Sequence, residues 1–278
     1  MTTTILAATD LSARSDRAVD RALNLGAELQ LPVSIVHVHD PKESASIAHE
    51  PLREAVQSVL PDPNSDCEIL TLTGPVPRTI AKAADEHKAA MILTGVARFN
   101  SLGDYVTGTA VNAILRHAKV PVLIVKHRPH HPYRRILCAV DFSPHSAKAL
   151  LAALRLFPQA NVIAIHAYHV PFESWNKADY VREEVAATAQ KDFEAFLSGL
   201  PVSDEDRQRL DYCTGYGDIG VVLKNELDRN DVDLVVFGTH GMGGFRQATI
   251  GSIASSLLEW VVPDTLVVPP GWELENPT

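Results

Sequence analysis

The eight residues ILAATDLS at positions 5–12 return as ILCAVDFS at positions 136–143. In both stretches an apolar run with the length of a buried strand ends in Asp and then Ser, residue types that commonly cap helices. Apolar residues at helical spacing follow in each copy, so each strand leads into an amphipathic helix. One kind of strand-to-helix turn therefore occurs twice.

Two further pairs of apolar runs keep the same order in both halves. VSIVHV at 33–38 matches VIAIHA at 162–167, and MILTG at 91–95 matches LVVFG at 234–238. Short β-branched strands that alternate with helices predict a parallel sheet covered on both faces. We therefore expect an α/β protein made of two tandem doubly wound domains, each with a five-stranded parallel sheet.

The segment 126–135 separates the halves, because two prolines and clustered cations interrupt the apolar pattern. It predicts an exposed linker, with a first domain at 1–129 and a second at 130–278. The second copy is longer between its second and third strands, where residues 178–200 carry a charged helical pattern. We expect a solvated helix there.

The composition fits two globular domains: 278 residues are 46% hydrophobic and 21% charged. With 34 acidic and 25 basic residues the formal net charge is −9, so neither nucleic acid nor an anionic membrane is an expected partner. The three cysteines are far apart, which argues against a disulfide framework or a zinc site. The chain shows neither a basic leader nor an apolar run of about 18 residues, so we expect a cytoplasmic protein.

A glycine pattern follows the fourth strand of the second half. Gly238 and Gly241 are followed, after nine further residues, by Gly251 and Ser252 in the form G-x2-G-x9-G-S. A glycine at a strand end lets the backbone turn sharply and approach a ligand. Gly251 and Ser252 would offer free N–H groups and the positive end of a helix dipole to phosphates. The loop can therefore cradle a triphosphate without a catalytic side chain.

These features together resemble the ATP-binding universal stress proteins, and the resemblance covers nearly the whole chain, twice. It implies flavodoxin-like (Rossmann-like) domains with strand order 3-2-1-4-5, related by a pseudo-twofold axis. It also implies that Asp141 lies beside the nucleotide, Ala167 contacts the base, and the glycines wrap the phosphates. The implied ligand is ATP, with Mg²⁺ as an accompanying metal and no metal ligands in the protein. The nucleotide-binding residues would be Asp141, Ala167, Phe237, Gly238, Gly241, Gly251, Ser252 and Ile253.

Simpler roles exist for the same residues: the glycines could make tight turns, and Ser252 or Asp141 could cap a helix. In the first half the matching frame is degenerate, because Arg98 stands where the second half has Gly241. A side chain there would obstruct backbone contact with phosphate, so we expect loss of binding; alternatively its guanidinium pairs with phosphate. The residues of this first frame are Asp10, Val38, Gly95, Arg98, Gly108 and Thr109.

Three other patterns favour a structural role. Gly215, Gly217 and Gly220 form G-x-G-x-x-G, but on the third strand of the repeat, which argues against a dinucleotide site. The histidines at 127, 130 and 131 lack the spacing of metal ligands. His37 and His166 recur at one strand end, where we expect them to fill a polar corner of the fold.

No P-loop lysine motif and no G-x-S-x-G elbow is present in the sequence, so we expect no catalytic residues and at most slow hydrolysis. The expected function is nucleotide-dependent stress signalling or protection through an unidentified protein partner. The rival is a chaperone-like or scaffold protein with vestigial nucleotide binding. The sequence leaves open whether two tandem chains form a dimer.

Overall fold

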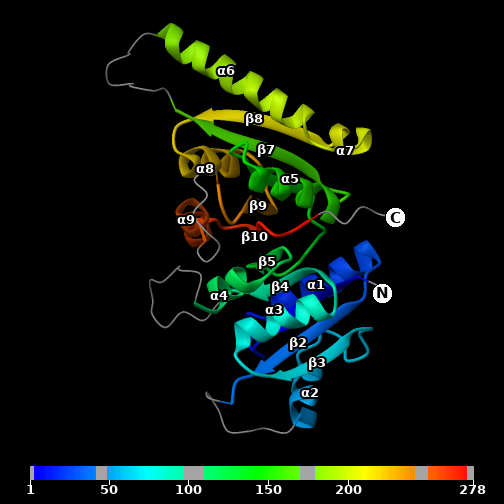
Figure 1. Ribbon diagram of the computed structural model, residues 1–278. Helices are drawn as coiled ribbons and strands as arrows, with labels where there is room; N and C mark the ends of the chain where they lie inside the picture. Colours follow the sequence, from blue (N-terminus) through cyan, green and yellow to red (C-terminus); the bar gives the residue numbers. More distant parts are fainter. Residues whose placement is uncertain (1–2, 42–48, 97–108, 170–178, 242–249, 274–278) are drawn as a thin grey trace. The chain divides into compact units, whose positions relative to one another are not determined.

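The computed structural model describes residues 3–41, 49–96, 109–169, 179–241 and 250–273 (Figure 1). The chain divides into two compact units. Unit 1 comprises residues 1–132 and 245–278, and unit 2 comprises residues 133–244. Each unit is described by itself below.

Unit 1 is built on a sheet whose first five strands are parallel, in the order β3-β2-β1-β4-β5. This order confirms the expectation for the first half. A sixth strand from the end of the chain, β10, pairs antiparallel with β5, with Leu266 opposite Leu123. The strands are β1 (Thr4–Thr9), β2 (Val33–His39), β3 (Glu68–Thr73), β4 (Ala89–Gly95), β5 (Val122–Val125) and β10 (Asp264–Val268).

The helices of unit 1 cover a fully apolar central strand. Ile5, Leu6 and Ala7 of β1 are 0% exposed, because α1 packs on β1 and β4 and the neighbouring strands flank both edges. Helices α3 and α4 pack against each other. The helices are α1 (Asp16–Leu29), α2 (His49–Ser58), α3 (Val76–Glu86), α4 (Thr109–His117) and α9 (Ser252–Trp260).

Unit 2 repeats this arrangement with four parallel strands in the order β8-β7-β6-β9. Its central strand β6 buries Ile136, Leu137 and Cys138 completely. The strands are β6 (Arg135–Ala139), β7 (Asn161–Tyr168), β8 (Leu210–Tyr216) and β9 (Leu234–Gly238). The helices are α5 (Pro144–Leu156), α6 (Asp179–Ser198), α7 (Asp204–Gln208) and α8 (Ile219–Arg229).

Helix α6 corrects one expectation, because it is not simply a solvated helix. It packs on β7 and β8, along which it lies in Figure 1. Ala189, Phe193 and Leu197 are buried on one face, and Phe193 is 0% exposed. The ring of Phe193 lies 5.0 Å from that of Tyr212 and 5.3 Å from that of Phe142. The inserted segment therefore has a buried apolar face in addition to its charged residues.

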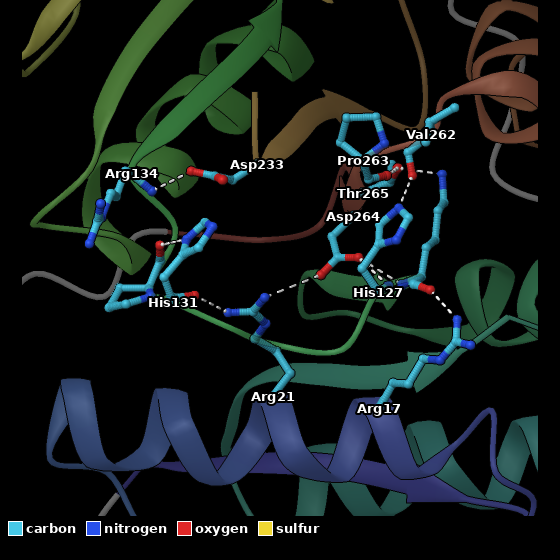
Figure 2. Close-up of polar contacts among 12 residues, drawn as sticks. Arg17, Arg21, His127, His131, Arg134, Asp233, Val262, Pro263, Asp264 and Thr265 are labelled. Atoms are coloured by element: carbon cyan, nitrogen blue, oxygen red, sulfur yellow. Dashed lines mark hydrogen bonds and ion pairs between the residues drawn. The ribbon is translucent and has the colours of Figure 1, made fainter. Parts of the chain in front are cut away.

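The segment that follows β5, residues 126–131, is also not simply an exposed linker, because hydrogen bonds hold it in place. Buried Asp264 accepts hydrogen bonds from the backbone N–H groups of Lys126 (2.7 Å) and His127 (3.1 Å), and Arg21 of α1 lies 3.8 Å from its carboxylate (Figure 2). Arg21 also donates to the carbonyl of His131 at 2.9 Å. These contacts fix residues 126–131 against α1 and β10.

None of the helices in the described part of the chain is long and apolar enough to span a membrane.

Candidate functional site

Asp141 lies in the turn between β6 and α5, two residues beyond the end of the strand. Its Oδ1 accepts a hydrogen bond from the backbone N–H of Ser143 at 3.1 Å, and Phe142 between them has φ of 62°. Ser143 is the N-cap of α5, since its Oγ accepts from the N–H of Ser146. Asp141 is therefore not the helix cap of α5.

Gly238 and Gly241 stand at the carboxyl end of β9, which pairs with β6. A Cβ atom on Gly238 would meet the backbone carbonyl oxygen of His145 at 3.2 Å. A Cβ atom on Gly241 would lie 2.5 Å from Oδ2 of Asp141. The structure thus brings Asp141 and Gly241 side by side, from sequence positions 100 residues apart.

Ala167 is the penultimate residue of β7, at the same carboxyl edge of the sheet, and it pairs with Gly215 of β8. The neighbouring His166 donates from Nδ1 to the carbonyl of Val140 at 2.8 Å, and its ring stacks on Phe142 with centroids 4.0 Å apart. Since this imidazole is engaged in holding the turn, its role is structural. Phe237 is 3% exposed, so only its backbone can reach a ligand.

Gly251, Ser252 and Ile253 open α9, which belongs to unit 1. Gly251 is the N-cap without a capping side chain, and its carbonyl accepts from the N–H of Ser255 at 2.9 Å. Ser252 is exposed, and Ile253 is 59% exposed. The first N–H groups of this helix have no intrahelical partner, as at any helix start. Residues 242–249 of the glycine pattern lie outside the described residues.

Two histidines that the sequence analysis missed join this cluster in unit 2. His145 lies in the first turn of α5 and His240 lies between Gly238 and Gly241, with ring centroids 6.0 Å apart. Their positions offered a signal, because His240 is inside G-x2-G and His145 follows Ser143 by two residues. Asp141, His145, Gly238, His240 and Gly241 therefore form one neighbourhood at the carboxyl edge of the sheet.

The sequence model of the universal stress protein family matches residues 1–126 and, separately, residues 132–269. The chain belongs to the universal stress protein family. It is 24% identical to a universal stress protein of Mycolicibacterium smegmatis, over 96% of this chain and 97% of that protein. It is 25% identical to a universal stress protein of Mycobacterium tuberculosis, over 67% of this chain and 60% of that protein.

Solved structures show the same fold. A universal stress protein from Archaeoglobus fulgidus gives a TM-score of 0.69 at 18% identity, covering 98% of this chain and 100% of the other. A Pseudomonas aeruginosa protein of unknown function gives a TM-score of 0.70 at 18% identity, covering 97% and 93%. These likenesses confirm two α/β domains of the flavodoxin-like universal stress protein fold.

The first universal stress protein copy reproduces the turn of the second. Oδ1 of Asp10 accepts from the N–H of Ser12 at 3.0 Å, Leu11 has φ of 61°, and Nδ1 of His37 donates to the carbonyl of Thr9 at 3.0 Å. A Cβ atom on Gly95 would lie 2.7 Å from the carbonyl oxygen of Arg14. The side chain of Val38 is 7% exposed. Arg98 and Gly108 lie outside the described residues, and Thr109 begins α4, where its side chain is likewise not described.

The G-x-G-x-x-G pattern of the second copy has structural causes, as expected. A Cβ atom on Gly215 would meet Cγ1 of Val222 at 2.3 Å, and Gly217 has φ of +116°. The Asp218 side chain caps α8 and accepts from the N–H of Gly220 at 2.8 Å. A carboxylate thus stands where a dinucleotide would place its pyrophosphate, which argues against NAD.

The linker histidines of this universal stress protein engage backbone groups. Nε2 of His127 donates to the carbonyl of Val262 at 2.9 Å, and Nδ1 of His131 donates to that of Pro132 at 2.9 Å (Figure 2). Among the described residues there is no group of three His, Cys, Asp or Glu side chains that could hold a metal ion.

Proposed function

We propose that the second universal stress protein copy binds an adenine nucleotide, ATP, and acts in the stress response through the nucleotide-bound form. The observation that carries the proposal is the position of Asp141 beside Gly241, with Gly238 against His145, at the carboxyl ends of β6 and β9. From β6 the chain continues outward to β7 and β8 and then returns to β9 on the other side of β6. The strand order therefore reverses between β6 and β9. Ligands of open α/β sheets bind at such switch points.

The chemistry of this edge suits a nucleotide. Gly241 cannot carry a side chain without meeting Asp141, so bare backbone lies against this carboxylate. The carboxylate of Asp141 accepts hydrogen bonds and repels phosphate, and its fitting partner is therefore a hydroxyl or amino group of the nucleoside. The glycine pattern adds Gly251, Ser252 and Ile253 as phosphate donors, as a prediction from the sequence. If Mg²⁺ accompanies ATP, the phosphates would supply its ligands.

Titration calorimetry with ATP and with NAD tests the proposal, together with identification of any nucleotide released from the purified protein. We expect saturable ATP binding and much weaker NAD binding, because Asp218 already occupies the donor of Gly220. Hydrolysis should be slow, since the site contains no predicted catalytic residue. Binding of NAD without binding of ATP would reject the proposal in favour of a dinucleotide site. Binding of neither would reject it in favour of a scaffold role.

A further inference from the structure

Two imidazoles lie beside the glycines of the proposed nucleotide site. His145 comes from the first turn of α5 and His240 from the residues after β9, and their rings are 6.0 Å apart at an angle of 52°. Gly238 lies directly against His145, since a Cβ atom on this glycine would be 3.5 Å from that of His145. In contrast, His37 and His166 each donate to a backbone carbonyl of their turn.

Each of the two rings has a buried nitrogen without a hydrogen-bond partner among the described residues. These atoms are Nδ1 of His145 and Nε2 of His240. The other nitrogen of His240, Nδ1, shares a hydrogen bond of 2.9 Å with Oγ1 of Thr239. A buried polar atom left without a partner costs about 1–3 kcal/mol. Two such atoms on neighbouring rings would be explained by a ligand that pairs with them.

The surroundings of His145 favour its neutral state in the free protein. Burial lowers the pKa of His145, and the nearby His240 and Lys148 lower it further, whereas Asp141 raises it. These are the titratable groups that face His145 from α5, from the turn after β6 and from the end of β9. An anion placed against the rings would reverse this balance, because it stabilises the protonated imidazole.

We propose that His145 and His240 bind the phosphate chain of the nucleotide as a proton-coupled pair, so that binding takes up a proton from solvent and strengthens as the pH falls. The inference rests on the proposed function and adds its regulation. A transition metal is the weaker occupant, since the described residues supply no third protein ligand. In this proposal the two histidines contact only the phosphates and not the nucleoside. Adenosine binding should therefore take up no proton.

The test compares ATP binding at pH 6.0 and pH 8.0 in wild type and in the double variant His145→Gln, His240→Gln. Because both proteins meet the same ionisation of ATP, the difference between them isolates the histidines. We expect wild-type affinity to fall about tenfold more than that of the variant across this range, which corresponds to a mean uptake of about half a proton over the two pH units. Calorimetry in buffers of different ionisation enthalpy should show the same uptake directly. His130→Gln, at an exposed histidine of the segment between the two copies, is the matched control.

The outcomes separate the two proposals. Equal pH dependence in wild type and double variant, with ATP bound by both, overturns the proton-coupled pair and leaves the nucleotide site standing. Absence of ATP binding in wild type rejects the proposed function itself. Binding of Zn²⁺ by the nucleotide-free wild type but not by the double variant would assign the pair to a metal and also overturn the inference. Circular dichroism and adenosine binding establish that the double variant is folded.

Discussion

Single residues explain why the two strand-end glycines are not equivalent. Gly238 faces backbone, because the carbonyl oxygen of His145 would be 3.2 Å from its Cβ atom. Gly241 faces only the end of a side chain, the Oδ2 atom of Asp141. Backbone in the first turn of a helix cannot move without disturbing its cap, whereas a carboxylate can rotate about its own bonds. We therefore expect Gly238 to matter for the stability of the fold and Gly241 for the proposed site.

Gly241→Ala should weaken ATP binding at least tenfold while leaving thermal stability nearly unchanged. The new methyl group pushes Asp141 out of position, and this residue is one that we place against the nucleotide. Calorimetry and thermal unfolding measure the two effects. Gly199→Ala is the matched control, because a methyl group there meets only ordinary contacts of 3.5 and 3.6 Å. Unchanged affinity in a folded Gly241→Ala protein would remove Gly241 and Asp141 from the site.

Gly238→Ala should behave in the opposite way and lower the free energy of unfolding. The methyl group must be accommodated against the backbone of α5, at a cost of about 1–3 kcal/mol, the range observed for overpacked positions. Denaturant unfolding of Gly238→Ala and wild type measures this difference. A variant as stable as wild type would show that the helix start yields easily and that our structural reason for this glycine is wrong.

For helices and strands, the sequence predicted features set by nearby residues and missed those set by residues far apart in the chain. The strands and the Asp-x-Ser turns follow from patterns within about ten residues, and the structure confirms them. The buried stripe of Ala189, Phe193 and Leu197 was present at helical spacing, but the charges between these residues concealed it. The position of Arg21 gave no signal at all, because its buried partner Asp264 lies at the far end of the chain.

The elements α1, β5 and β10 meet at a set of buried charges, which makes their stability depend on pH. Nζ of Lys126, which follows β5, donates to the carbonyl of Val261 and to Oγ1 of Thr265. Burial lowers the pKa of Lys126 to about 8, although Asp264 opposes this shift. Between about pH 8 and the ordinary lysine value of 10.5 the unfolded chain binds more protons than the folded one. The contribution of Lys126 to the free energy of unfolding therefore rises with pH across this window.

Lys126→Met should abolish that rise. From pH 7.5 to pH 9.5 the stability of wild type should increase by about 2 kcal/mol relative to the variant, as the pKa difference requires. Urea unfolding at the two pH values supplies the measurement. Lys119→Met serves as the control, since Lys119 is an exposed lysine paired with Asp85. If both variants track wild type equally, Lys126 keeps an ordinary pKa in the folded protein.

The whole molecule carries two copies of one turn with different chemistry around it. Both copies keep the Asp-x-Ser turn, the strand-end histidine and the first glycine. The repeat alignment pairs Arg14 with His145, Ala97 with His240 and Arg98 with Gly241. The first copy therefore lacks the second glycine and both of the unpaired imidazoles. Sequence could reveal the missing glycine, whereas the importance of the histidines depended on distances that no local pattern encodes.

This asymmetry predicts one bound ATP per chain. An arginine at position 98 carries its side chain where Gly241 presents bare backbone, in the copy whose Asp10 corresponds to Asp141. Calorimetric stoichiometry measures the number of sites, and Gly241→Ala should remove most of the wild-type signal. If Arg98 instead pairs with phosphate, wild type should bind close to two nucleotides and Arg98→Ala should weaken one of the sites.

The variant Arg98→Gly then tests whether the arginine side chain alone prevents ATP binding in the first copy or whether that copy lacks other binding residues as well. If the arginine side chain is the only obstacle, this variant should raise the stoichiometry from one toward two. The restored site should differ from the second in its pH dependence, because Arg14 and Ala97 cannot take up a proton as His145 and His240 do. A stoichiometry that stays at one in a folded Arg98→Gly protein would mean that the first copy has lost more than a glycine. In that case its Asp-x-Ser turn is maintained for the fold alone.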